Sequence, residues 1–175
     1  MTVATVMPML GVLLLRRGPQ DLPADFPVLG FWMGASLFSG VLVAASQHGF
    51  IPSLLLGALD LLVLYLFVVA LLRLKGISAG RWLQTYTALV GVSAMLGLVM
   101  SALLWLLPPD FENGSVPVPA MMLYLGLVVW LLLAFGHIFQ KALDLRLRMT
   151  GVAIALGFLV LSSVVTQLAL GWVTA

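Results

Sequence analysis

Asp60 is the residue of this sequence with the strongest potential for chemistry, because it lies inside a long apolar run. Residues 53–74 contain one other charged residue, Arg73, at the end of the run. An ionisable side chain is costly in an apolar environment, and desolvation favours its neutral form. Two interpretations follow: Asp60 is a proton or cation site, or it is a neutral acid that holds a neighbouring helix by a hydrogen bond.

Several polar residues of other apolar runs fall near the expected depth of Asp60. Counted at 1.5 Å per residue from residue 53, Asp60 lies about 10 Å below the membrane surface. Residues at a similar depth in neighbouring runs can share hydrogen bonds with it. The predicted buried polar layer consists of Asp60, Ser39, Ser101, Thr166 and Gln167.

A second cluster of polar residues lies at the other end of the predicted bundle, away from Asp60. His137, Gln140 and Asp144 are three or four residues apart, so they share one helix face. Gln84 is expected to face His137, and Arg73 is expected to reach Asp144. These five residues predict a polar mouth; the alternative is a helix end that is solvated at the membrane interface.

Catalytic templates are missing from the sequence. The chain has no cysteine and two histidines, and it contains neither an HExxH nor a GxSxG motif. An aspartyl intramembrane protease needs two buried carboxylates, and the apolar runs hold only Asp60. Ser36 and His137 differ in expected depth by about 9 Å, too far for a hydrogen bond. We therefore predict no enzyme, no cofactor and no metal site, with an intramembrane enzyme as a distant alternative.

The composition decides the class of protein. The chain has 175 residues, of which 63% are hydrophobic and 8% charged, and its mean hydropathy is +1.21. A soluble domain carries about a quarter charged residues. The net charge of +2 is too small for nucleic-acid binding. The sequence therefore predicts an all-α polytopic membrane helix bundle.

Five apolar runs are each long enough to cross a bilayer, which takes about 20 helical residues. The predicted spans are 26–46, 53–74, 83–107, 121–143 and 150–172.

Two glycines in the first span, Gly30 and Gly34, form a GxxxG pair. Such a pair permits close helix packing, either within the bundle or at a dimer face.

The basic residues predict the orientation. If the five spans alternate in direction, all eight Lys and Arg fall on one side of the membrane. The stretch between the third and fourth spans carries Asp110 and Glu112 and falls on the other side. The positive-inside rule then places the amino terminus in the cytoplasm and the carboxy terminus outside. The eight basic residues are Arg16, Arg17, Arg73, Lys75, Arg81, Lys141, Arg146 and Arg148.

Residues 1–25 precede the five-span bundle of residues 26–175. The apolar stretch 2–15 has its positive charges, Arg16 and Arg17, behind it, which is the wrong order for a secretory signal. We expect a short helix in the cytoplasmic interface, followed by a proline-rich connector. A short sixth span with an outside amino terminus is the alternative.

The predicted plan resembles that of the Yip (Ypt-interacting protein) family and its bacterial relatives. The likeness rests on five spans, an outside carboxy terminus, and a cytoplasmic connector, GPQDLP at residues 18–23. The stretches RWLQTYTAL (81–89) and GHIFQKAL (136–143) are similar to small proteobacterial membrane proteins. The resemblance implies a bacterial inner membrane and supplies neither an activity nor functional residues.

The expected function is therefore association. We interpret the chain as an interaction or membrane-organising bundle whose partners are the lipid bilayer and another membrane protein or a second copy. The alternative is a small proton- or cation-coupled transporter or channel subunit that uses Asp60.

Overall fold

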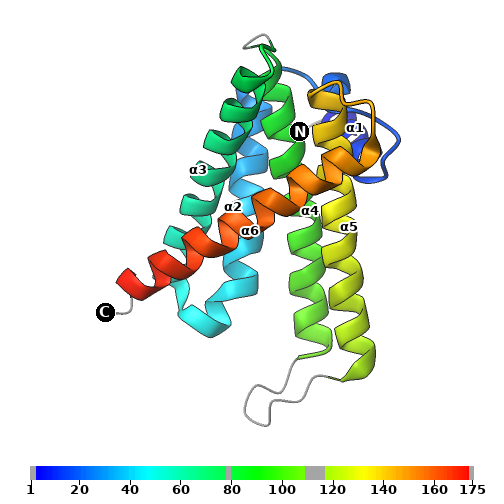
Figure 1. Cartoon of the computed structure of the whole chain (residues 1–175). Coiled ribbons are helices and arrows are strands. Elements are labelled where there is room, and N and C mark those ends of the chain that lie inside the picture. The colour runs from blue at the N-terminus through cyan, green and yellow to red at the C-terminus, as the bar shows by residue number, and fades with distance from the viewer. Residues whose placement is uncertain (1–2, 78–79, 109–116, 174–175) are drawn as a thin grey trace.

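The computed structural model describes residues 3–77, 80–108 and 117–173, without the side chains of residues 3–5, 46, 172 and 173. This part of the chain is helical and contains no strand (Figure 1). The elements in chain order are α1 (Val3–Leu13), the short 3-10 turn η1 (Pro19–Asp21), α2 (Phe26–His48), α3 (Phe50–Leu74), α4 (Arg81–Leu106), α5 (Val118–Ala142) and α6 (Arg148–Val173).

Helices α2 to α6 are each long and apolar enough to cross a membrane. The prediction of an all-α bundle with five spans is therefore confirmed, and no helix end lies more than three residues from the predicted one. Asp110 and Glu112, which contributed to the predicted orientation, lie outside the described residues.

The turn between α2 and α3 is shorter than the sequence indicated. Gly49 alone separates the two helices, and its φ of 79° is a conformation that favours glycine. Pro52 falls in the first turn of α3, where a missing N–H breaks no helical hydrogen bond. The hydroxyl of Ser53 donates to the Gly49 carbonyl at 2.7 Å. Helix α3 consequently begins at Phe50, three residues before the predicted start.

Helix α4 forms the centre of the bundle, in contact with α1, η1, α2, α3 and α5. Its residues from Thr85 to Val92 are all buried. Close packing against α2 depends on Gly97, because a Cβ atom there would lie 3.0 Å from the Cβ of Ser39. Small residues permit such an approach in lipid. Gly30 and Gly34, in contrast, are exposed and have nothing within 4 Å of an added Cβ.

Helix α6 crosses the bundle obliquely from α5 towards α3 (Figure 1) and contacts both. It meets α5 backbone to backbone, since a Cβ on Gly136 would lie 2.9 Å from both N and Cα of Val152. Beneath it, an aromatic cluster joins three helices: the ring centroids of Phe67 and Phe158 are 5.4 Å apart, and those of Phe67 and Phe139 are 5.9 Å apart. The cluster consists of Phe67, Phe135, Phe139 and Phe158.

The amino-terminal helix α1 packs on the bundle. Its 11 residues span about 16 Å, half of what a membrane crossing requires, so it does not form the sixth span. Met9 and Val12 are fully buried, and the Met9 thioether fills the space beside Gly91 that a Cβ would occupy.

Three side chains of the spans bind main-chain carbonyls of the amino-terminal segment. The Trp130 indole N–H donates to the Leu13 carbonyl at 3.2 Å, and Nε2 of His137 lies 3.1 Å from the Arg17 carbonyl oxygen. These contacts fix α1 against α5. Gln84 likewise donates to the Leu22 carbonyl at 2.8 Å, which ties the connector to α4.

Candidate functional site

Asp60 lines a half-open cavity of about 280 Å³ between α2, α3, α4 and α5. We call it the Asp60 cavity. Its α5 wall is formed by apolar residues, and its other walls carry serines and glycines. The lining residues are Ser36, Ser39, Gly40, Val43, Gly57, Asp60, Leu61, Ser93, Leu96, Gly97, Met100, Leu127, Val128 and Leu131.

The Asp60 carboxyl accepts a hydrogen bond from α6. The hydroxyl of Ser162 donates to Oδ1, and among the described residues no hydrogen bond to Oδ2 is recorded. No Lys, Arg or His belongs to the cavity lining. One carboxyl oxygen thus has capacity for a donor that the described part of this chain does not supply.

The cavity lies between the two ends of the spans, and its α5 wall reaches the lateral surface of the bundle. Asp60 is ten residues after the start of α3, so it lies about 15 Å along the helix from that end. Val128, on the α5 wall, is 46% exposed. If the five helices cross a bilayer, a lateral surface at this depth is expected to meet hydrocarbon.

A packed apolar layer separates the cavity from the other end of the bundle. One and two turns from Asp60 along α3, Leu64 and Val68 are almost fully buried. Leu89 of α4 is completely buried, and three phenylalanines of the aromatic cluster, Phe135, Phe139 and Phe158, are buried with 1 to 3% of their surface exposed. The same stretch of α4 also buries the side chains of Tyr86 and Thr87, and the Tyr86 hydroxyl donates to the Leu61 carbonyl, next to Asp60. Leu64, Val68 and Leu89 thus interrupt the polar groups between Asp60 and the basic residues.

The structure brings together only part of the predicted polar layer. Ser39 lines the cavity with Asp60, and its hydroxyl donates to the Ser36 carbonyl at 3.0 Å. Ser101 does not line the cavity; it donates to the Leu98 carbonyl of its own helix at 2.9 Å. Thr166 and Gln167 of α6 are likewise absent from the lining, so this cavity does not bring them together with Asp60. Ser162 takes their place, one turn earlier.

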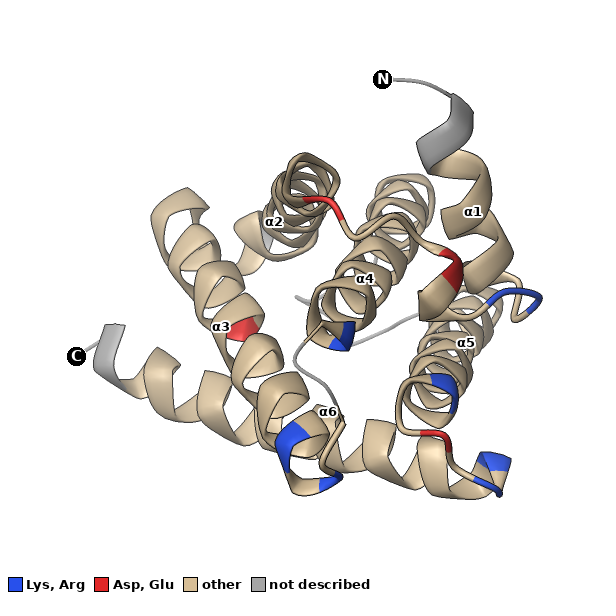
Figure 2. Cartoon of the chain, turned by 90° about the horizontal axis from the view of Figure 1, so that it is seen from above, with Lys and Arg blue, Asp and Glu red and all other residues tan. Residues whose placement is uncertain are grey.

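All eight basic residues lie at one end of the bundle, which we call the basic end. Figure 2 shows them at the ends of α3 to α6 and beside η1, around the end where α1 lies. Positively charged groups grouped at one end are typical of the cytoplasmic side of a membrane protein.

The predicted polar mouth is divided into two pockets at the basic end. Gln84 and Asp144 line one of about 250 Å³ together with Arg81 and Lys141; we call it the Arg81 pocket. His137 and Gln140 line a second pocket of about 120 Å³ with Arg148.

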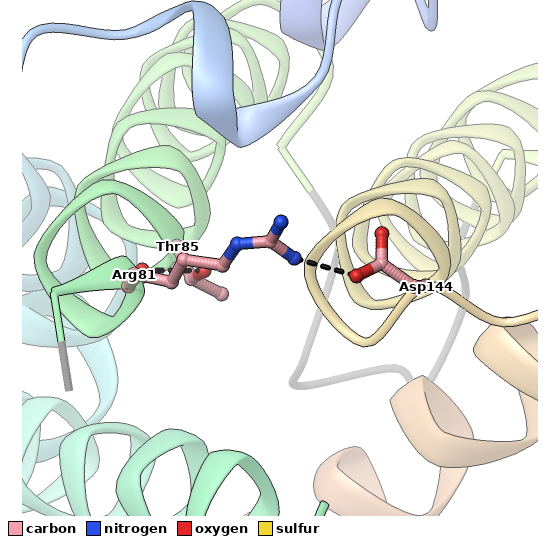
Figure 3. Close-up of polar contacts among 3 residues, drawn as sticks. All are labelled: Arg81, Thr85 and Asp144. Carbon is pink, nitrogen blue, oxygen red and sulfur yellow. Dashed lines mark hydrogen bonds and ion pairs between the residues drawn. The ribbon is translucent and has the colours of Figure 1, made fainter. Parts of the chain in front are cut away.

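Arg73 lines neither pocket, and the predicted contact between Arg73 and Asp144 was wrong. The partner of Asp144 is Arg81, whose Nη1 lies 2.6 Å from Oδ2 (Figure 3). The physical reason is the helix order: α5, which ends just before Asp144, packs beside α4, whereas Arg73 lies on α3.

A larger hollow of about 420 Å³ lies on another side of the bundle, between α2, α3 and α4. The polar side-chain groups of its lining residues are the hydroxyls of Tyr65 and Tyr86 and the indole N–H of Trp82. The Tyr86 hydroxyl donates to the Leu61 carbonyl at 2.9 Å. Lacking a charged group, this hollow is suited to lipid chains.

Ser36 and His137, the two residues considered for a serine protease, line separate pockets. Ser36 lines the Asp60 cavity, whereas His137 faces Arg17 and a separate pocket. Within the described ranges, no three His, Cys, Asp or Glu residues lie close enough to hold a metal ion.

Comparisons of this chain with family models, with curated proteins and with solved structures found no match. The resemblance to the Yip family therefore stays a prediction.

Proposed function

We propose that this protein acts by association, as a non-enzymatic membrane bundle that binds another membrane protein at the Asp60 cavity. The observation that carries the proposal is the position of Asp60 in a half-open cavity whose α5 wall includes the exposed Val128. We infer that this cavity opens sideways within the bilayer. A carboxyl at this depth is costly unless a hydrogen-bonding or charged partner meets it. A transmembrane helix of a partner can bring such a group through the lateral opening.

The partner's chemistry follows from the groups around Asp60. The Ser162 hydroxyl already donates a hydrogen bond to Oδ1 of Asp60, and no Lys, Arg or His lines the cavity. In the described spans, Lys and Arg occur only at the basic end, so a second copy has no basic residue at the matching depth. We therefore infer a different protein whose helix carries a Lys, an Arg or a strong N–H donor.

Transport through Asp60 is the alternative function, favoured by the cavity beside an acid. The packed side chains of Leu64, Val68 and Leu89 support association instead, because a proton or cation route needs a continuous chain of polar groups or water, and the buried Tyr86 hydroxyl already bonds the Leu61 carbonyl.

Flux in liposomes separates the two functions. Association predicts no proton or cation flux above that of protein-free vesicles, for the wild-type protein or for Asp60→Asn. Asn keeps the size of the side chain but cannot titrate. A wild-type flux that Asp60→Asn abolishes would contradict association and support transport.

We further propose a bacterial inner-membrane location with the basic end in the cytoplasm. The chain has no cysteine, so single cysteines report the orientation. Gln47 is exposed at the end opposite the basic end, and Gly80 is exposed next to Arg81. A membrane-impermeant maleimide should label Gln47→Cys in spheroplasts, and Gly80→Cys only after permeabilisation. The reverse pattern would invert the proposed topology.

A further inference from the structure

The Arg81 pocket is formed by three segments that are distant in sequence. Gln20 comes from η1, Arg81 and Gln84 from the first turn of α4, and Lys141 from the last turn of α5. The charged groups that line the pocket are Arg81, Lys141 and Asp144. Two cations and one acid leave a formal charge of +1 in a pocket at the end of the bundle.

The ion pair neutralises the acid of the pocket. Arg81 extends from α4 across to Asp144 (Figure 3), and the recorded contact uses Nη1 alone. The guanidinium has five N–H donors, which leaves several for a further acceptor. Both side chains are largely accessible, with 46% of Arg81 and 70% of Asp144 exposed, so a ligand can reach them.

Lys141 supplies the excess positive charge. The only ion pair recorded among the described residues is Arg81 with Asp144, so Lys141 is not neutralised there. An ammonium and a planar guanidinium that line one pocket are suited to the oxygens of a phosphate group. Gln84 already donates to the Leu22 carbonyl and holds the connector that closes one side.

The position of the pocket relates the anion to the membrane. The pocket is beside the first turn of α4 and the last turn of α5, where the spans leave the hydrocarbon. The neighbouring Leu83 and Leu143 are buried, so the apolar bundle begins directly below it. Basic pockets between spans at this level are suited to lipid headgroups.

We propose that the Arg81 pocket binds the phosphate group of an anionic membrane lipid. Arg81 and Lys141 contact the phosphate oxygens, while Asp144 keeps the guanidinium in position. The site is distinct from the Asp60 cavity and does not depend on the proposed association there.

Titration with short-chain lipids tests this proposal on the full-length protein in a neutral detergent. Phosphatidylglycerol is compared with phosphatidylcholine, whose phosphate is balanced by its own cation. Lys141→Gln removes a pocket charge without touching the ion pair, and Lys75→Gln removes an exposed charge at the same end but outside the pocket. The melting temperature of each variant serves as its folding control.

The expected result is selective binding of phosphatidylglycerol, weakened about fivefold by Lys141→Gln and less than about twofold by Lys75→Gln. Equal losses for the two variants, or equal binding of both lipids, would overturn the site. Inorganic phosphate is the third ligand. If it displaces phosphatidylglycerol in a Lys141-dependent manner, the site serves a soluble anion, and the lipid assignment is wrong.

Discussion

Gly151→Ala is expected to lower the free energy of unfolding by about 1 to 3 kcal/mol, as overpacking does in a close helix contact. A Cβ at position 151 would overlap the carbonyl oxygen of Gly136 and would lie 3.1 Å from both N and Cβ of Gln140. Backbone atoms cannot turn aside as a flexible side chain can. The start of α6 must therefore move away from α5.

The matched control is Gly157→Ala on the same helix, where nothing lies within 4 Å of an added Cβ. Alanine is the better helix former by up to about 1 kcal/mol, so this variant should be at least as stable as the wild-type protein. Reversible unfolding in mixed micelles measures both. Equal stability of the two variants would show that α5 and α6 do not meet at Gly136 and Gly151.

Asp60→Arg is expected to destabilise the folded protein by up to about 2.5 to 3.5 kcal/mol, because a permanent charge at the centre of a spanning helix replaces a carboxyl that can become neutral. The described spans contain no other Asp or Glu, so the new charge has no partner at that depth. The arginine would also displace the hydrogen bond from Ser162 to Asp60. Unfolding in mixed micelles and the amount of folded protein in the membrane should both report the loss.

Asp60→Asn provides the comparison. Its amide oxygen still accepts a hydrogen bond from Ser162, so the free energy of unfolding should change by less than about 1 kcal/mol. If Asp60→Arg were as stable as Asp60→Asn, the cavity would be filled with water, and its proposed exposure to hydrocarbon would be wrong.

The spans could be predicted from the sequence because apolar length is the main signal of a membrane helix. Helix ends are less certain, and the start of α3 illustrates the consequence. Pro52 indicated a break, but proline is tolerated in a first helical turn, and α3 starts at Phe50. The added three residues move Asp60 from about 10 Å to about 15 Å along its helix.

This shift accounts for the missed partner of Asp60. Thr166 matched the shallower estimate, whereas Ser162 is about one turn deeper, at the level of Asp60 in α3. With α3 starting at Phe50, the adjacent serines Ser162 and Ser163 fall at the expected depth of Asp60. The oblique course of α6 adds to the error in depth (Figure 1), because a rise of 1.5 Å per residue gives the depth only for a helix parallel to the membrane normal.

The partner of Asp144 could not be predicted, since Arg73 and Arg81 flank the same turn. Only the order of the helices decides between them, and α4 lies beside α5.

The docking of α1 is another tertiary feature that the sequence does not predict. Met9 fits beside Gly91 because of shape, which the apolar pattern does not encode.

Site-specific photo-crosslinking in native membranes tests the central claim, association at the Asp60 cavity. A photoreactive residue replaces Val128 on the cavity wall or, as a control, Leu168 on α6, which is 63% exposed and outside the lining. Each position is combined with Asp60→Ala and with Leu55→Ala, an exposed residue of α3 that does not line the cavity.

Association predicts a discrete protein adduct at position 128 and none at 168. Asp60→Ala should reduce the adduct about tenfold or more, as loss of a charge-assisted hydrogen bond does, and Leu55→Ala should leave it unchanged. An adduct that adds 18.7 kDa, the mass of a second copy, would contradict a different partner. Adducts that are the same at 128 and 168, or unaffected by Asp60→Ala, would contradict association at the cavity.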